Sequence, residues 1–115
     1  MWPTRGEKVM PDIEVALKNA SDTAHEYARL DGDARRLEKM EKILFSELVN
    51  QCDESSVAKC EHWARGHVTY KDHVLKMVDA RTTANLAKAD WDVTQMKFEA
   101  WRTQQATTRA EMNLR

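Results

Sequence analysis

The stretch from Ile13 to Leu48, IEVALKNASDTAHEYARLDGDARRLEKMEKILFSEL, decides the fold class. Its apolar residues recur mostly three and four positions apart, which puts them on one face of an α-helix. They are Ile13, Leu17, Ala20, Ala24, Tyr27, Ala34, Leu37, Ile43, Leu44 and Leu48. Gly32 interrupts this stripe at a cost of roughly 1 kcal/mol of helix propensity. We expect one long helix over about residues 12–50, and the sequence leaves open whether Gly32 breaks it.

The composition favours the same fold class. The chain has 115 residues, with 14 alanines but only 3 glycines and 2 prolines, and both prolines lie within the first eleven residues. Alanine is the best helix former, whereas glycine and proline are the strongest breakers. This composition argues against an all-β fold, and the length is that of one domain.

Residues that typically begin or end helices predict two further helices. We expect Ser55 or Ser56 to cap a short helix over about residues 55–66, which Gly66 closes. Thr69 and Asp72 have the spacing of a capping box, which predicts a second long helix over about residues 70–113. Its core candidates are Leu75, Val78, Leu86, Ala89, Val93, Met96 and Ala100, with Trp91, Phe98 and Trp101 widening the apolar face.

These elements define the expected architecture. Residues 1–11 lack a period and are expected to form a flexible leader, and residues 12–115 a single helical domain. Helices of roughly 40 residues span about 60 Å, too long to fold back into a globule. We therefore predict an all-α fold, an elongated antiparallel helical hairpin of two long helices with a short intervening helix. Such a hairpin exposes apolar surface, so we expect a homo-oligomer or a docking partner to cover it.

The charge is balanced overall but uneven along the chain. There are 18 Lys and Arg residues against 19 Asp and Glu residues, a formal net charge of -1. Residues 1–57 carry 8 basic and 12 acidic side chains, whereas residues 58–115 carry 10 and 7. An anionic partner is therefore expected to meet the second half. No apolar run is long enough to cross a bilayer, and no signal peptide is apparent, so we expect no membrane partner and a cytoplasmic location.

The sequence offers little for catalysis or metal binding. It lacks a phosphate-binding glycine loop, a His-Glu-x-x-His pair and a Gly-x-Ser-x-Gly elbow, so we expect no enzyme, no catalytic residue and no cofactor. Cys52 and Cys60 are too far apart for the usual zinc spacing, and we expect no metal site. A disulfide between them is not expected in a reducing compartment.

One cluster near the C-terminus has two interpretations. Trp91, Phe98 and Trp101 alternate with cations, and such a surface could stack bases and contact phosphates through Lys97, Arg102, Arg109 and Trp101. Alternatively, the aromatic rings belong to the core or to an oligomer contact. The predicted interface residues are Trp91, Phe98, Trp101, Leu86 and Val93.

The C-terminal stretch also carries a resemblance. Phe98–Thr103, FEAWRT, and Thr108–Leu114, TRAEMNL, resemble the ending of a group of small all-helical phage proteins that accompany DNA recombination and replication. Proteins of this layout are similar to the UvsY class of recombination mediators, helical oligomers that bind single-stranded DNA and help load a recombinase. The resemblance implies phosphate contacts at Lys97, Arg102 and Arg109, with Trp101 as a stacking platform. It also implies a recombinase or a single-strand-binding protein as a partner.

Two function hypotheses follow. The first is a non-enzymatic phage or prophage accessory protein for DNA recombination or replication, which binds single-stranded DNA or recombination proteins as an oligomer in the host cell cytoplasm. The second is a helical protein-interaction module, such as a phage inhibitor or assembly adaptor, with no nucleic-acid binding.

Overall fold

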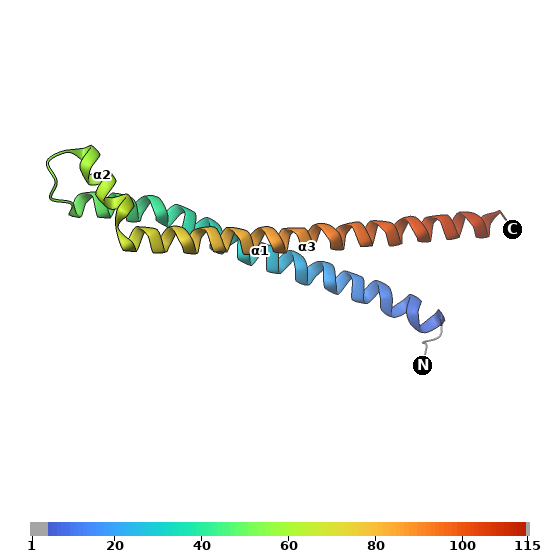
Figure 1. Ribbon diagram of the computed structural model, residues 1–115. Helices are drawn as coiled ribbons and strands as arrows, with labels where there is room; N and C mark the ends of the chain where they lie inside the picture. Colours follow the sequence, from blue (N-terminus) through green and yellow to red (C-terminus); the bar gives the residue numbers. More distant parts are fainter. Residues whose placement is uncertain (1–4, 115) are drawn as a thin grey trace. The chain divides into compact units, whose positions relative to one another are not determined.

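The protein is all-α. The computed structural model describes the backbone of residues 5–114 and the side chains of residues 13–114. Three helices account for nearly all of this range: α1 (Arg5–Gln51), α2 (Val57–Gly66) and α3 (Val68–Asn113), with no strand among the described residues (Figure 1). The predicted fold class, two long helices with a short helix between them, is confirmed.

The described fold divides into two compact units. Unit 1 consists of Met1–Tyr27 and Ala87–Arg115, and unit 2 is Ala28–Leu86. Unit 2 contains the end of α1, all of α2 and the start of α3, and its two long segments run antiparallel (Figure 1). Unit 2 is therefore a helical hairpin.

The core of unit 2 is formed by heptad positions on both long helices. On α1 one row of buried and half-buried residues has alternating spacings of three and four; it consists of Leu30, Ala34, Leu37, Glu41, Leu44 and Leu48. On α3 the corresponding residues are Tyr70, His73, Met77, Ala80 and Ala84. Ala34 and Ala84 are completely buried. Small side chains at these positions allow the two helix backbones to approach closely.

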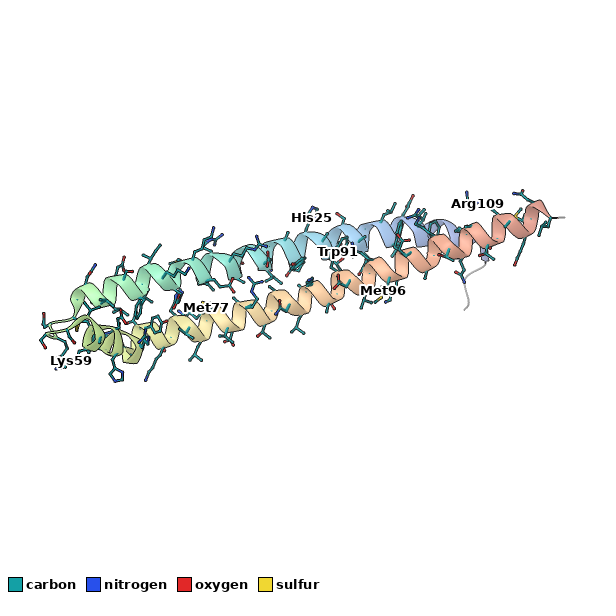
Figure 2. All side chains as sticks on the ribbon, turned by 90° about the horizontal axis from the view of Figure 1, so that it is seen from above. His25, Lys59, Met77, Trp91, Met96 and Arg109 are labelled. Carbon is teal, nitrogen blue, oxygen red and sulfur yellow. A yellow bond between two sulfur atoms is a disulfide. The ribbon has the colours of Figure 1, made fainter. Side chains whose placement is uncertain are left out.

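The core predicted for α3 lies on the wrong side of that helix. Leu75, Val78 and Leu86 are 65%, 53% and 65% exposed, and Ala89, Val93, Met96 and Ala100 are exposed as well. The side that packs on α1 is the opposite one. In Figure 2 the labelled Met77 lies on the side of α3 toward α1. Both sides have apolar residues at helical spacing, so the period alone does not select between them.

Polar contacts between α1 and α3 select the packed side. Arg81 donates from Nε and Nη2 to both carboxylate oxygens of Glu38, at 3.0 and 2.7 Å, and from Nη1 to Asp31 at 2.7 Å. Asp31 and Glu38 are one heptad apart and so lie on the same face of α1. The contact is two-pronged, the geometry in which an arginine binds a carboxylate most strongly.

Two further hydrogen bonds hold the same faces together. The Tyr70 hydroxyl donates to Glu41, and His73 Nε2 donates to the backbone carbonyl of Leu37 at 2.7 Å. The Glu41 contact raises the pKa of Tyr70 above its usual value, since the phenol must stay protonated to donate. Tyr70, His73 and Arg81 of α3 thus all donate hydrogen bonds to acceptors on α1.

The α2 helix is fixed to the end of α1 by a disulfide. Cys52 and Cys60 are bonded, with Cα atoms 5.4 Å apart, so the expectation of two free thiols is wrong for this structure. Residues 53–56 fold back because Ser56 caps α2, its hydroxyl accepting from the Lys59 amide at 3.2 Å. This turn brings the buried face of α2, where Cys60 lies, against the α1 end.

The helix starts differ from the sequence predictions in two places. α1 is already helical at Arg5, so the predicted leader is wrong for residues 5–11, and residues 1–4 lie outside the described part of the chain. The backbone angle fixed by proline is compatible with a helix, and Pro11 removes one donor without ending it. α3 begins at Val68 without a Thr69 capping box, since His67 Nδ1 accepts the Thr69 amide at 3.1 Å instead.

We expect the Arg81 contact to give a pH-dependent stability. Arg81 holds the pKa of Glu38 below its usual value of 4.5 mainly through their hydrogen bond. A carboxyl with a lowered folded-state pKa stabilises the fold above that usual value and loses the effect as the pH falls through the folded-state pKa. Arg81→Gln should therefore lower the melting temperature at pH 7, and by less at pH 3. Arg36→Gln, at an exposed ion pair with Asp33, is the control, and an equal loss from both variants would contradict the assignment.

Gly32 is a weak point without being a break. α1 is continuous through it, and a Cβ atom built there meets no heavy atom within 4 Å. Gly32→Ala should raise the free energy of unfolding by about 0.5–1 kcal/mol, because alanine loses less backbone entropy in a helix. Urea denaturation measures this, with the reverse change Ala28→Gly at an exposed site of α1 as the control. A lower midpoint for Gly32→Ala would show that the helix needs the glycine.

Candidate nucleic-acid interface

The three aromatic residues of the predicted site are half-buried in unit 1. Trp91 and Phe98 are one heptad apart on α3, and Phe98 stacks on Trp101 with ring centroids 6.0 Å apart. Leu17 and Ala20 of α1 line the same groove, of about 440 Å³, as Trp91 and Phe98. Trp91 lies on the α1 side of α3 in Figure 2. Trp91 and Phe98 therefore contribute to the packing of unit 1.

A second, open depression lies further along α3 and combines an aromatic ring with cations. Trp101, Arg102 and Arg109 lie around it, and its volume is about 580 Å³. The remaining lining residues are Glu99, Thr103, Gln105 and Ala106. Arg102 and Arg109 are one heptad apart, so the helix itself places both guanidinium groups on one side.

The ion pair at this depression is weak enough to be exchanged. Arg102 Nη1 contacts Glu99 Oε1 at 3.1 Å, and the two side chains are 61% and 65% exposed. Exposed ion pairs contribute only about 0–1 kcal/mol, because water screens both charges. A phosphate can therefore replace the Glu99 carboxylate as the partner of Arg102, and a guanidinium can donate to two phosphate oxygens at once.

Lys97 does not belong to this depression. It precedes Arg102 by five residues, which is a rotation of about 140° around the helix at 3.6 residues per turn. It is exposed and lies near the side that carries Val93 and Met96. The structure thus brings three of the four predicted nucleic-acid contacts together, Trp101, Arg102 and Arg109, and separates the fourth.

The five predicted interface residues also divide between two sides of α3. Trp91, Phe98 and Trp101 are half-buried, whereas Leu86 and Val93 are 65% and 43% exposed on the side away from α1. Met96, on that same side, points away from α1 in Figure 2. Leu86 and Val93 are therefore the two predicted interface residues that are both exposed to another molecule.

The loop histidines have structural contacts of their own. His67 accepts a backbone amide and its ring lies edge-on to Trp63, with centroids 5.1 Å apart, while His73 bonds to α1. Among the residues that the structure describes, no group of three or more His, Cys, Asp or Glu side chains is arranged to hold a metal ion. None of the described helices combines the length and apolar character that crossing a membrane requires.

Comparisons of the chain with protein-family models, with curated proteins and with solved structures found no match. The candidate interface is therefore defined by the geometry of α3.

Proposed function

We propose that this protein is a non-enzymatic phage or prophage accessory protein for DNA recombination or replication, acting as an oligomer in the host cell cytoplasm. Its ligand is single-stranded DNA, presented to a recombinase or a single-strand-binding protein. The observation that supports the proposal most is the open depression where Trp101, Arg102 and Arg109 meet. The resemblance of residues 98–114 to phage recombination proteins supports the same function.

The chemistry of the depression suits a nucleic-acid strand. Arginine side chains neutralise phosphates, and each neutralised phosphate releases condensed counterions, which drives binding at low salt. A base can stack on the accessible part of the Trp101 ring, which contributes about 1–3 kcal/mol for a base on an aromatic platform. Two arginines and one ring bind weakly by themselves, so an oligomer that repeats the site along one strand is needed for useful affinity.

The cytoplasmic location bears on the Cys52–Cys60 bond. The pair is a disulfide in this structure, whereas disulfides are rare in a reducing compartment. In that compartment α2 is held by its packed residues Cys60 and Ala64 and by the Ser56 cap. The proposed strand site in unit 1 contains no cysteine, so it does not depend on the redox state.

Titration of a labelled single-stranded oligonucleotide at 50 and 200 mM salt tests the function. We expect binding that weakens with salt, because phosphate contacts exchange with cations. The double variant Arg102→Glu, Arg109→Glu should lose at least tenfold in affinity at the lower salt concentration, with unchanged helicity.

The matched control is Lys39→Glu, Lys42→Glu, which makes the same change in net charge on an exposed part of α1. An equal loss in both double variants would mean that net charge alone attracts the strand. Binding that is absent at 50 mM salt, or unaffected by salt, would contradict the proposal.

A second function is favoured by the exposed apolar side of α3. Leu86 and Val93 are available to a protein partner, which suits an interaction module such as a phage inhibitor or assembly adaptor. The titration separates the two functions, because an interaction module gives no salt-dependent strand binding.

A further inference from the structure

The turn between α1 and α2 places two sulfur atoms against the backbone of one residue. The Glu54 amide donates to Cys52 Sγ at 3.3 Å, and Cys60 Sγ lies 3.7 Å from the Glu54 carbonyl oxygen. The two sulfur atoms are bonded to each other, and the Cα atoms of the two cysteines are 5.4 Å apart. All three residues belong to unit 2, so the arrangement is contained in one compact unit.

These contacts suit the reduced cysteines as well as the disulfide. A disulfide sulfur can only accept a hydrogen bond, whereas a thiol can also donate one. Once the bond is broken, Cys60 can donate its S–H to the Glu54 carbonyl oxygen. The Glu54 amide can stabilise a Cys52 thiolate, because a hydrogen bond to the charged form favours that form. The turn therefore offers each sulfur a backbone partner after reduction.

The two cysteines differ in their access to solvent. Cys60 is 7% exposed and lies on the buried face of α2, whereas Cys52 is half-buried just after the end of α1. Residues 53–56, which follow Cys52, are all exposed. A small molecule therefore reaches Cys52 more easily than Cys60. Since the thiolate is the reactive form of cysteine, access and the Glu54 amide both favour Cys52 as the nucleophile.

We infer that Cys52 and Cys60 form a reversible thiol–disulfide exchange site for low-molecular-weight disulfides and thiols, in which Cys52 attacks and Cys60 resolves. The Cys52 thiolate attacks one sulfur of the small disulfide, which forms a mixed disulfide and releases one thiolate. Cys60 then loses its proton to water, attacks Cys52 Sγ and expels the second thiolate. The two protein thiols are oxidised, and the small disulfide is reduced to two thiols. Reduction follows the same steps in reverse.

The redox state of this site controls how firmly α2 is held. α2 has 10 residues, and helices shorter than about 12–15 residues are marginal in water without tertiary contacts. In the reduced protein its contacts are the packed Cys60 and Ala64, the Ser56 cap and the Arg65 guanidinium, whose Cζ atom lies 5.4 Å from the centre of the Phe45 ring. The disulfide adds a covalent link between residues eight positions apart, which excludes open conformations. Oxidation should therefore make local opening of α2 rarer.

The inference goes beyond the proposed function and does not depend on it. The depression proposed for strand binding contains neither cysteine and belongs to unit 1. Strand binding can therefore fail while thiol–disulfide exchange is found, and the reverse also holds.

Oxidation of the fully reduced chain by glutathione disulfide, quenched with acid and followed by mass spectrometry, tests the inference. In the wild-type chain we expect complete conversion to the disulfide without denaturant, and full reversal by excess reduced glutathione. Cys60→Ser should accumulate a mixed disulfide at Cys52, because the resolving thiol is missing. Cys52→Ser is the matched control, and its remaining thiol should react on the order of tenfold more slowly, since Cys60 is buried.

Peptide mapping of the wild-type reaction gives the same assignment without any substitution. Trypsin cleaves after Lys59 and so separates Cys52 from Cys60. The first glutathione should be found on the peptide that contains Cys52.

Hydrogen exchange measures the effect on α2. Residues 57–66 should exchange about threefold faster or more in the reduced chain than in the oxidised chain, because the reduced α2 opens more often. Residues 34–48 of α1 are the internal control and should exchange equally in both states.

The inference is overturned by failure at any of its three steps. A pair that does not oxidise, or a bond that resists excess glutathione until the chain is denatured, is not an exchange site. Attachment of the first glutathione to Cys60, or equal rates in the two variants, contradicts the assigned roles. Equal exchange of residues 57–66 in both redox states would mean that the bond does not control α2.

Discussion

The α3 helix has apolar residues on two opposite sides, and α1 can cover only one of them. The covered side is the one where Arg81, Tyr70 and His73 find partners on α1. If the exposed side of α3 that carries Leu75 and Val78 packed on α1 instead, the hydrogen bonds from Arg81 to Asp31 and Glu38 would be lost. The loss of hydrogen bonds to a charged group costs more than the exchange of one set of aliphatic side chains for another. Polar matching thus decides the packing that hydrophobicity alone leaves open.

The sequence predicted the helices well because helix formation is largely local. The apolar spacing from Ile13 to Leu48 and the Ser56 cap depend on residues within a few turns of one another. The packed side of α3 depends on which residues of α1 lie opposite, and the period of α3 carries no information about that. A signal for it was present, since Asp31 and Glu38 stand one heptad apart, each directly after a leucine of the core row, Leu30 and Leu37.

Part of the candidate site could be predicted because it depends only on local helix geometry. Arg102 and Arg109 lie one heptad apart, so their common side follows from the sequence, and their closeness to Trp101 follows from the next position along the helix. Lys97 was grouped with them by sequence distance, which ignores the rotation of the helix. The disulfide could not be predicted from spacing, because it depends on how the turn after α1 directs α2.

The side of α3 that packs on α1 is tested most directly by enlarging one alanine on each side. Ala84 is completely buried, whereas Ala89 is exposed on another side of α3. Denaturant unfolding at low protein concentration should show a loss of about 1–3 kcal/mol for Ala84→Leu, because the extra atoms force the helices apart. Ala89→Leu should change the free energy of unfolding by less than about 0.5 kcal/mol. The opposite order would mean that the side of α3 carrying Ala89, and not the side carrying Ala84, packs on α1.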